Sequence, residues 1–198
     1  MTLEFRSFRL RLGFSFFAVL CLLLLSSGGT TALLCFSSAM LHECGHLLLL
    51  FAFGAGVEEV SFGAGGIVIL RRGCTSCGAG KESLIALGGI FVNCLLCFAA
   101  KLWYDKAKTQ TALVLLVVNG ALALLNLLPV QSLDFYRVLD LCFGRLGVAG
   151  RETVLRRVSL CAVVFFAACC AAMTACGVRN PSLWAVCGYL VYLHWKRS

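Results

Sequence analysis

The sequence has few charged residues and almost no proline. Only 13% of its 198 residues are charged and 61% are hydrophobic, whereas charged residues make up about 25% of a typical soluble domain. Two prolines exclude a proline-rich linker, and so apolar a composition excludes a disordered chain. Charge is absent from four long tracts, at 12–41, 83–100, 109–133 and 158–178. Because a helix needs about 20 apolar residues to cross a bilayer, these tracts indicate a polytopic membrane protein.

The apolar tracts predict an all-α fold with about six transmembrane helices in a single domain over residues 1–198. We expect these helices at about 12–26, 30–53, 83–102, 110–128, 158–176 and 181–195. A signal peptide is the alternative for the first of them, because three arginines precede it. No A-x-A cleavage site follows it, which favours a retained helix.

The net charge of +8 reflects membrane topology rather than nucleic-acid binding. With a cytoplasmic N-terminus, the segments between the predicted helices place 13 Lys and Arg residues inside and 4 outside. The positive-inside rule then predicts a multi-pass protein of the cell membrane with both termini in the cytoplasm. The inside residues are Arg6, Arg9, Arg11, Arg71, Arg72, Lys81, Arg137, Arg145, Arg151, Arg156, Arg157, Lys196 and Arg197, and the outside ones are Lys101, Lys106, Lys108 and Arg179.

Thirteen cysteines are present, and most of them lie within the predicted helices. Buried cysteine packs as a small hydrophobic residue, and the odd count argues against a disulfide framework. Cys74 and Cys77 are the only pair outside a predicted helix with the spacing of a zinc or redox site. No second such pair lies near them, so the sequence does not predict a structural zinc site there.

The most informative residues are the few ionisable ones inside the predicted membrane helices, because such residues are costly and usually functional. His42, Glu43 and His46 form an HExxH sequence within the second predicted helix. On a helix, residues four apart share a face, so both imidazoles can hold one Zn²⁺. Glu43 would then act as the general base toward the attacking water.

A catalytic zinc site needs a third protein ligand, and Asp134 is the first candidate. It follows the fourth predicted helix, which Pro129 is expected to end. The second and fourth predicted helices run in the same direction across the membrane, so Asp134 and His46 both lie toward the cytoplasmic ends of their helices. Asp140 is the alternative, although we expect it in a solvated arginine-rich loop.

Three features resemble the site-2 intramembrane metalloproteases, especially their compact sporulation-type bacterial branch. The first is the HExxH within a membrane helix. The second is a glycine-rich stretch at 57–70, similar to the membrane-associated β-hairpin of the family. The third comprises Asn126, Pro129 and Asp134, which resemble the asparagine–proline–aspartate motif of the family; a weaker match is the segment 88–93, which ends in Asn93. The resemblance covers about residues 30–140.

The resemblance implies a three-helix catalytic core that binds one zinc ion through His42, His46 and Asp134. It implies a membrane-protein substrate, and we expect Asn126 and Asn93 to contact that substrate, with hydrogen bonding between helices as the alternative for both. The charge distribution predicts cleavage near the cytoplasmic side, and a substrate that must unwind is expected to pair as an added strand with the 57–70 hairpin. Because we expect no PDZ or CBS domain, regulation is expected to lie in the loops, in a regulatory membrane partner or in the substrate itself. The chain departs from the family pattern at Phe135, where glycine is usual, and at Ile90, where proline is usual.

Two other functions are compatible with buried histidine and carboxylate groups. A metal or proton transporter would use them to line a pathway, but it predicts polar positions on the last two helices, which show almost none. A pseudo-protease would bind a membrane partner without cutting it. The intact HExxH and Asp134 favour the protease.

Overall fold

The computed structural model describes residues 2–4, 9–12, 29–63, 66–71, 78–131, 133–177 and 180–196. The chain forms two compact units, Met1–Ala123 and Leu124–Ser198. The first predicted membrane helix lies almost entirely outside the described residues, as do Cys74 and Cys77.

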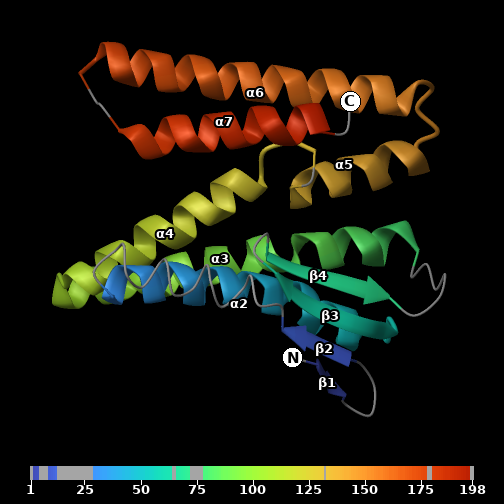
Figure 1. Cartoon of the computed structure of the whole chain (residues 1–198), viewed down its shortest axis with the longest axis horizontal. Helices are drawn as coiled ribbons and strands as arrows, with labels where there is room; N and C mark the ends of the chain where they lie inside the picture. Colours follow the sequence, from blue (N-terminus) through green and yellow to red (C-terminus); the bar gives the residue numbers. More distant parts are fainter. Residues whose placement is uncertain are drawn as a thin grey trace. The chain divides into compact units, whose positions relative to one another are not determined.

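Two long helices form the centre of the first unit. Helix α2 (Thr30–Ala52) and helix α3 (Ala79–Ala107) lie side by side and run in opposite directions, and α4 (Gln110–Asn126) runs in the same direction as α2 (Figure 1). Helix α2 begins where the sequence predicted and ends within one residue of its predicted end. Helix α3 is longer than predicted at both ends. Both helices are long and apolar enough to cross a membrane, whereas α4 is apolar but shorter.

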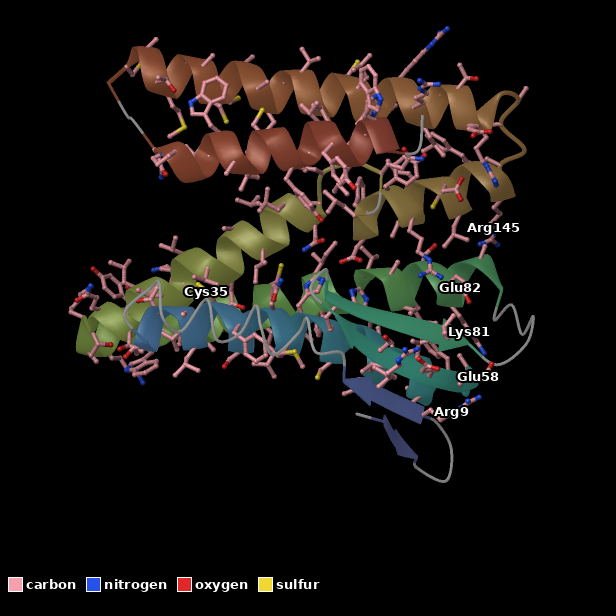
Figure 2. All side chains as sticks on the ribbon, in the orientation of Figure 1. Arg9, Cys35, Glu58, Lys81, Glu82 and Arg145 are labelled. Atoms are coloured by element: carbon pink, nitrogen blue, oxygen red, sulfur yellow. The ribbon has the colours of Figure 1, made fainter. Side chains whose placement is uncertain are left out.

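Two strands of a four-stranded sheet connect α2 to α3. The predicted hairpin is confirmed as β3 (Val57–Gly63) and β4 (Gly66–Arg71), which pair antiparallel with Val60 opposite Ile69. The sheet is larger than predicted, because β1 (Thr2–Glu4) pairs with β2 (Arg9–Leu12), and β2 pairs in parallel with β3. An exposed ion pair of 3.3 Å between Arg9 Nη2 and Glu58 Oε1 links β2 to β3 (Figure 2).

The sheet is anchored on the helices by a small apolar core. Leu50 of α2 and Ile85 of α3 pack with Val57 and Val60 of β3, and these side chains are almost fully buried. The chain turns from α2 into β3 through Gly54, whose φ of +67° is one that side chains disfavour. The core therefore fixes the ends of α2 and α3 that lie beside the HExxH sequence.

The second unit contains α5 (Asp134–Arg145), α6 (Arg151–Ala175) and α7 (Pro181–Lys196). Helices α6 and α7 pack antiparallel as a hairpin around a core of Val130, Val163, Leu190 and Leu193 (Figure 1). Helix α6 is long and apolar enough to span a membrane. The predicted arginine-rich loop is in fact helical at α5, because its apolar residues recur at helical spacing. Asp140 lies in α5 and forms a 3.1 Å ion pair with Arg151.

Candidate metal centre

Helix α2 brings the two histidines of the HExxH sequence together. His42 and His46 are both buried, with 6% and 9% of their surface exposed. Their Nε2 atoms lie 3.3 Å apart, and the two rings meet edge to face. Because the residues are four apart, the helix itself sets this arrangement. Two imidazole nitrogens therefore converge on one point inside an apolar helix pair.

A backbone carbonyl from α3 fixes the ring of His46. His46 Nδ1 lies 2.7 Å from the carbonyl oxygen of Ile85, which can only accept a hydrogen bond. The Nδ1 atom is therefore protonated, and in the neutral imidazole Nε2 keeps its lone pair. This outer contact is the kind that orients metal-ligating histidines in proteins.

Asn93 of α3 makes the corresponding contact with His42. Its side chain is fully buried, and its amide nitrogen lies 2.8 Å from His42 Nδ1. The Asn93 Oδ1 atom has no hydrogen-bond partner. A half-turn of the amide exchanges nitrogen and oxygen, so that Oδ1 accepts a hydrogen bond from a protonated Nδ1. In that arrangement His42, like His46, presents the lone pair of Nε2.

Two glycines, Gly45 of α2 and Gly88 of α3, let the helices approach closely at this point. A Cβ atom on Gly45 would lie 2.5 Å from the carbonyl oxygen of Gly88, and one on Gly88 would lie 2.7 Å from that of Gly45. The backbones of the two helices therefore touch, and any larger residue would force them apart. This contact places Asn93 and Ile85 against the histidines.

Gly89 leaves open the space beside the two Nε2 atoms. A Cβ atom on Gly89 would lie 2.5 Å from Nε2 of His42 and 2.5 Å from Nε2 of His46. The missing side chain thus coincides with the point where both lone pairs converge. Two oriented imidazoles beside a space that a methyl group would fill suit a metal ion, so the residues of the first unit fit two of its ligands.

The remaining predicted site residues are Glu43, which lies between the two histidines in α2, and two residues at helix ends. Glu43 follows His42 in α2 and is half-buried. Asn126 is the last residue of α4, and Asp134 is the first residue of α5. Both fall in the second unit. Within the first unit, the structure brings together His42, His46 and Asn93.

Sequence reasoning missed the Ile85 carbonyl and the role of Gly89. The carbonyl carries no signal in the sequence, because every residue has one. The Gly88–Gly89 pair was visible, and a pair of small residues within an apolar helix is a known sign of close helix contact. Its position opposite the histidines follows only from the pairing of α2 with α3.

Comparisons with known proteins bear on the fold. No protein-family model matches the sequence, and no curated protein matches it. The structure is similar to that of the site-2 protease from Methanocaldococcus jannaschii, with a TM-score of 0.59 and 16% sequence identity over 99% of this chain and 94% of that one. The chain has the site-2 protease fold. Within the described part of the chain, three helices are long and apolar enough to cross a membrane, which agrees with this fold and indicates a membrane protein.

Proposed function

We propose that the protein is an intramembrane zinc metalloprotease that hydrolyses peptide bonds of membrane-embedded or membrane-associated proteins. One observation carries the proposal: the Nε2 atoms of His42 and His46 converge at 3.3 Å within an apolar helix. A fold alone does not define a reaction. A buried imidazole pair on this fold, however, agrees with the protease activity stated in the name of the similar solved structure.

The proposed ligands of one zinc ion per chain are His42, His46 and Asp134. These two imidazoles and one carboxylate form a donor set that could hold a metal ion. Three protein ligands of nitrogen and oxygen type, with a fourth position left open, are typical of catalytic zinc. Zinc bound there would supply Lewis acidity and lower the pKa of water to about 7.

Glu43 is the proposed general base. It lies between the two histidines in α2 and is less buried than either. A carboxylate at this position takes a proton from the attacking water and later delivers it to the leaving amine. The same group therefore serves both halves of the reaction.

The two asparagines have different proposed roles. Asn126, at the end of α4, would hydrogen-bond the backbone of the substrate. Asn93 was expected to contact substrate as well, but its 2.8 Å contact with His42 supports a role in orienting that imidazole. Substrate binding by Asn93 stays a prediction.

The excess of Lys and Arg supports a topology with both termini in the cytoplasm. Cleavage would then release a cytoplasmic product, as in regulated intramembrane proteolysis, under the control of a membrane partner. A fluorescent reporter that folds only in the cytoplasm tests the orientation when fused to the C-terminus. A bright fusion supports the topology, and a dark but membrane-inserted fusion contradicts it.

The function is tested with purified protein in vesicles together with a model transmembrane substrate. Cleavage should stop when a chelator removes the metal and return when zinc is added. Vesicles loaded with a zinc-sensitive dye provide the comparison with a transporter. Zinc uptake without any cleavage would contradict the protease and support transport.

A further inference from the structure

Helix α6 carries two adjacent arginines at the point where its apolar part begins. Arg156 and Arg157 are the last charged residues before the charge-free tract 158–178, and both side chains are exposed. Because the hydrocarbon core of a bilayer excludes charge, the start of such a tract marks the level of the lipid phosphates. The two guanidinium groups therefore lie at the level of phospholipid headgroups.

An exposed tryptophan on α7 marks the same level independently. Ser159 Oγ lies 3.0 Å from His194 Nδ1, so this part of α7 is level with the helical turn that follows Arg156. Trp195 is the next residue of α7, and 78% of its surface is exposed. Tryptophan is enriched at the membrane–water interface, because its ring is apolar and its N–H is polar. Both helices of the hairpin therefore indicate the interface at this point.

The two arginines have no acidic partner within the described part of the chain. Neither Arg156 nor Arg157 forms an ion pair or a hydrogen bond with a described residue. Arg151 of the same helix, by contrast, forms its 3.1 Å ion pair with Asp140. Glu152 is one turn before Arg156, but it forms no ion pair with that arginine. Two neighbouring guanidinium groups are thus available to an anion.

The exposed face of α6 continues from these arginines as apolar surface. Leu160 is one turn beyond Arg156 and Arg157, and Val164 is one turn beyond Leu160, so the four residues share a face. Both apolar side chains are exposed. This face therefore has cations at one end and uncovered apolar surface over the next two turns. A phospholipid has the complementary order, with a phosphate followed by acyl chains.

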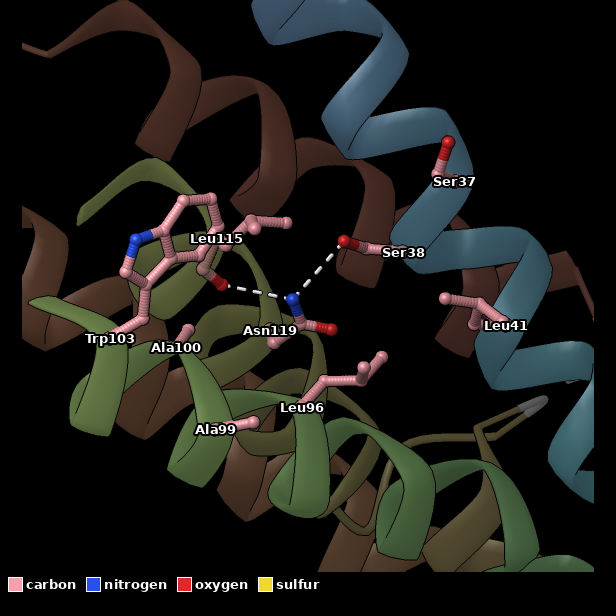
Figure 3. Close-up of a pocket in the computed structure, with 9 residues that line it drawn as sticks. All are labelled: Ser37, Ser38, Leu41, Leu96, Ala99, Ala100, Trp103, Leu115 and Asn119. Carbon is pink, nitrogen blue, oxygen red and sulfur yellow. Dashed lines mark hydrogen bonds between the residues drawn. The ribbon is translucent and has the colours of Figure 1, made fainter. Parts of the chain in front are cut away.

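A pocket in the first unit lacks these cations. It has a volume of about 170 Å³, lies between α2, α3 and α4, and is almost wholly apolar, with no charged residue among those that line it. Asn119, which borders it, donates hydrogen bonds to Ser38 Oγ and to the carbonyl oxygen of Leu115 (Figure 3). Such walls suit any acyl chain and distinguish no headgroup. The arginines of α6 supply the charge that selection among lipids requires.

We propose that Arg156 and Arg157 bind the phosphate of an anionic phospholipid whose acyl chain lies along Leu160 and Val164. A guanidinium group donates two parallel hydrogen bonds to a phosphate, and two such groups together favour a headgroup without a compensating amine. The distribution of Lys and Arg predicts this end of α6 on the cytoplasmic side, where the leaflet carries a negative surface potential. The proposal is independent of the protease, because lipid binding requires neither metal nor cleavage.

The first test measures lipid binding to the purified full-length chain. Delipidated protein in detergent is titrated with phosphatidylglycerol and, separately, with phosphatidylcholine of the same acyl chains, and native mass spectrometry counts the bound lipids. The wild type should prefer phosphatidylglycerol. An arginine near an anionic lipid surface changes the affinity about fivefold, so Arg156→Gln combined with Arg157→Gln should lower the affinity for phosphatidylglycerol roughly 25-fold.

Two matched variants separate the position of the charge from its amount. Lys101→Gln combined with Lys106→Gln removes two exposed cations from α3 and should leave the lipid preference unchanged. Arg156→Lys combined with Arg157→Lys keeps the charge on α6 and should retain most of the preference. Equal binding of the two lipids by the wild type, or equal losses in the α3 and α6 glutamine variants, would overturn the proposal.

The second test locates the bound lipid. Phosphatidylglycerol with a diazirine in the upper part of its acyl chain is mixed into phosphatidylcholine vesicles that contain the full chain. Crosslinks should concentrate at Leu160 and Val164 and fall several-fold in the double glutamine variant of α6. Phe91 and Phe98, two exposed residues of α3, report unselective contact with lipid. Crosslinks as frequent there as on α6 would contradict the site, and would leave the proposed protease untouched because neither readout uses cleavage.

Discussion

The side-chain amide of Asn93 lies against the ring of His42, with its nitrogen 2.8 Å from Nδ1. The contact joins α3 to the HExxH helix at a fully buried position. Together with the Ile85 carbonyl at His46, it leaves the Nε2 atoms of both rings facing one point. Contacts from α3 thus orient both imidazoles of α2.

Replacing Asn93 should weaken metal binding. Asn93→Ala removes the group that orients His42, and loss of such an outer contact typically costs 10–100-fold in metal affinity. Asn93→Asp should retain the affinity, because a carboxylate oxygen also accepts a hydrogen bond from Nδ1. Competition with a chromophoric chelator measures zinc affinity directly, and Cys94→Ala serves as the exposed neighbouring control. An unchanged affinity in Asn93→Ala would contradict the positioning role.

A methyl group at Gly89 should exclude the metal. The added Cβ would lie 2.5 Å from Nε2 of both histidines, in the space a ligand must occupy. We expect Gly89→Ala to fold and to bind little zinc. Gly80→Ala is the control in the same helix, because a Cβ there meets nothing within 4 Å. Zinc content is measured on both purified variants, and full occupancy of Gly89→Ala would refute the placement of the site.

Gly45 should be required for the packing of α2 on α3. A Cβ on Gly45 would lie 2.5 Å from the backbone oxygen of Gly88, which cannot rotate away. Overpacking of this kind costs about 1–3 kcal/mol of unfolding free energy. Thermal unfolding in detergent should show a lower midpoint for Gly45→Ala. Gly188→Ala in α7 is the control, because its added Cβ meets no atom within 4 Å, and it should leave the midpoint unchanged or raise it. Equal midpoints in both variants would argue against close contact between α2 and α3.

Glu43→Gln should separate metal binding from catalysis. Glutamine has the shape of glutamate but cannot act as a general base at neutral pH. The variant should bind zinc as well as wild type and lose cleavage of a transmembrane substrate by at least about 100-fold, the lower end of the usual general-base contribution. Mass spectrometry of the peptide products provides the readout. Wild-type rates would make Glu43 structural.

Much of the site could be predicted because its residues stand out from their surroundings. Two histidines four apart in an apolar tract predicted a helical metal pair, and α2 carries them as expected. The helical period determines that these two side chains share a face. The hairpin at 57–70 was expected from its resemblance to the β-hairpin of the site-2 proteases, and β3 and β4 confirm it.

Other features were not predicted. Some depend on contacts between distant segments, and others have a sequence pattern that was interpreted differently. Arg9, Leu10, Arg11 and Leu12 alternate as a strand does, but beside an apolar tract their charges were assigned to membrane topology. Val138 and its apolar neighbours recur at helical spacing in α5, where the arginines suggested a loop. The pocket beside Asn119 has no sequence signature, because three helices must pack before it exists.

The most direct test of the account is the zinc content of the purified full-length protein, measured by elemental analysis. We predict about one zinc per chain in the wild type and a sharp fall in His42→Ala, His46→Ala and Asp134→Ala, because each removes one of three ligands. Gly80→Ala should retain the full amount. Zinc retained in all three ligand variants would contradict the metal site, and with it the protease.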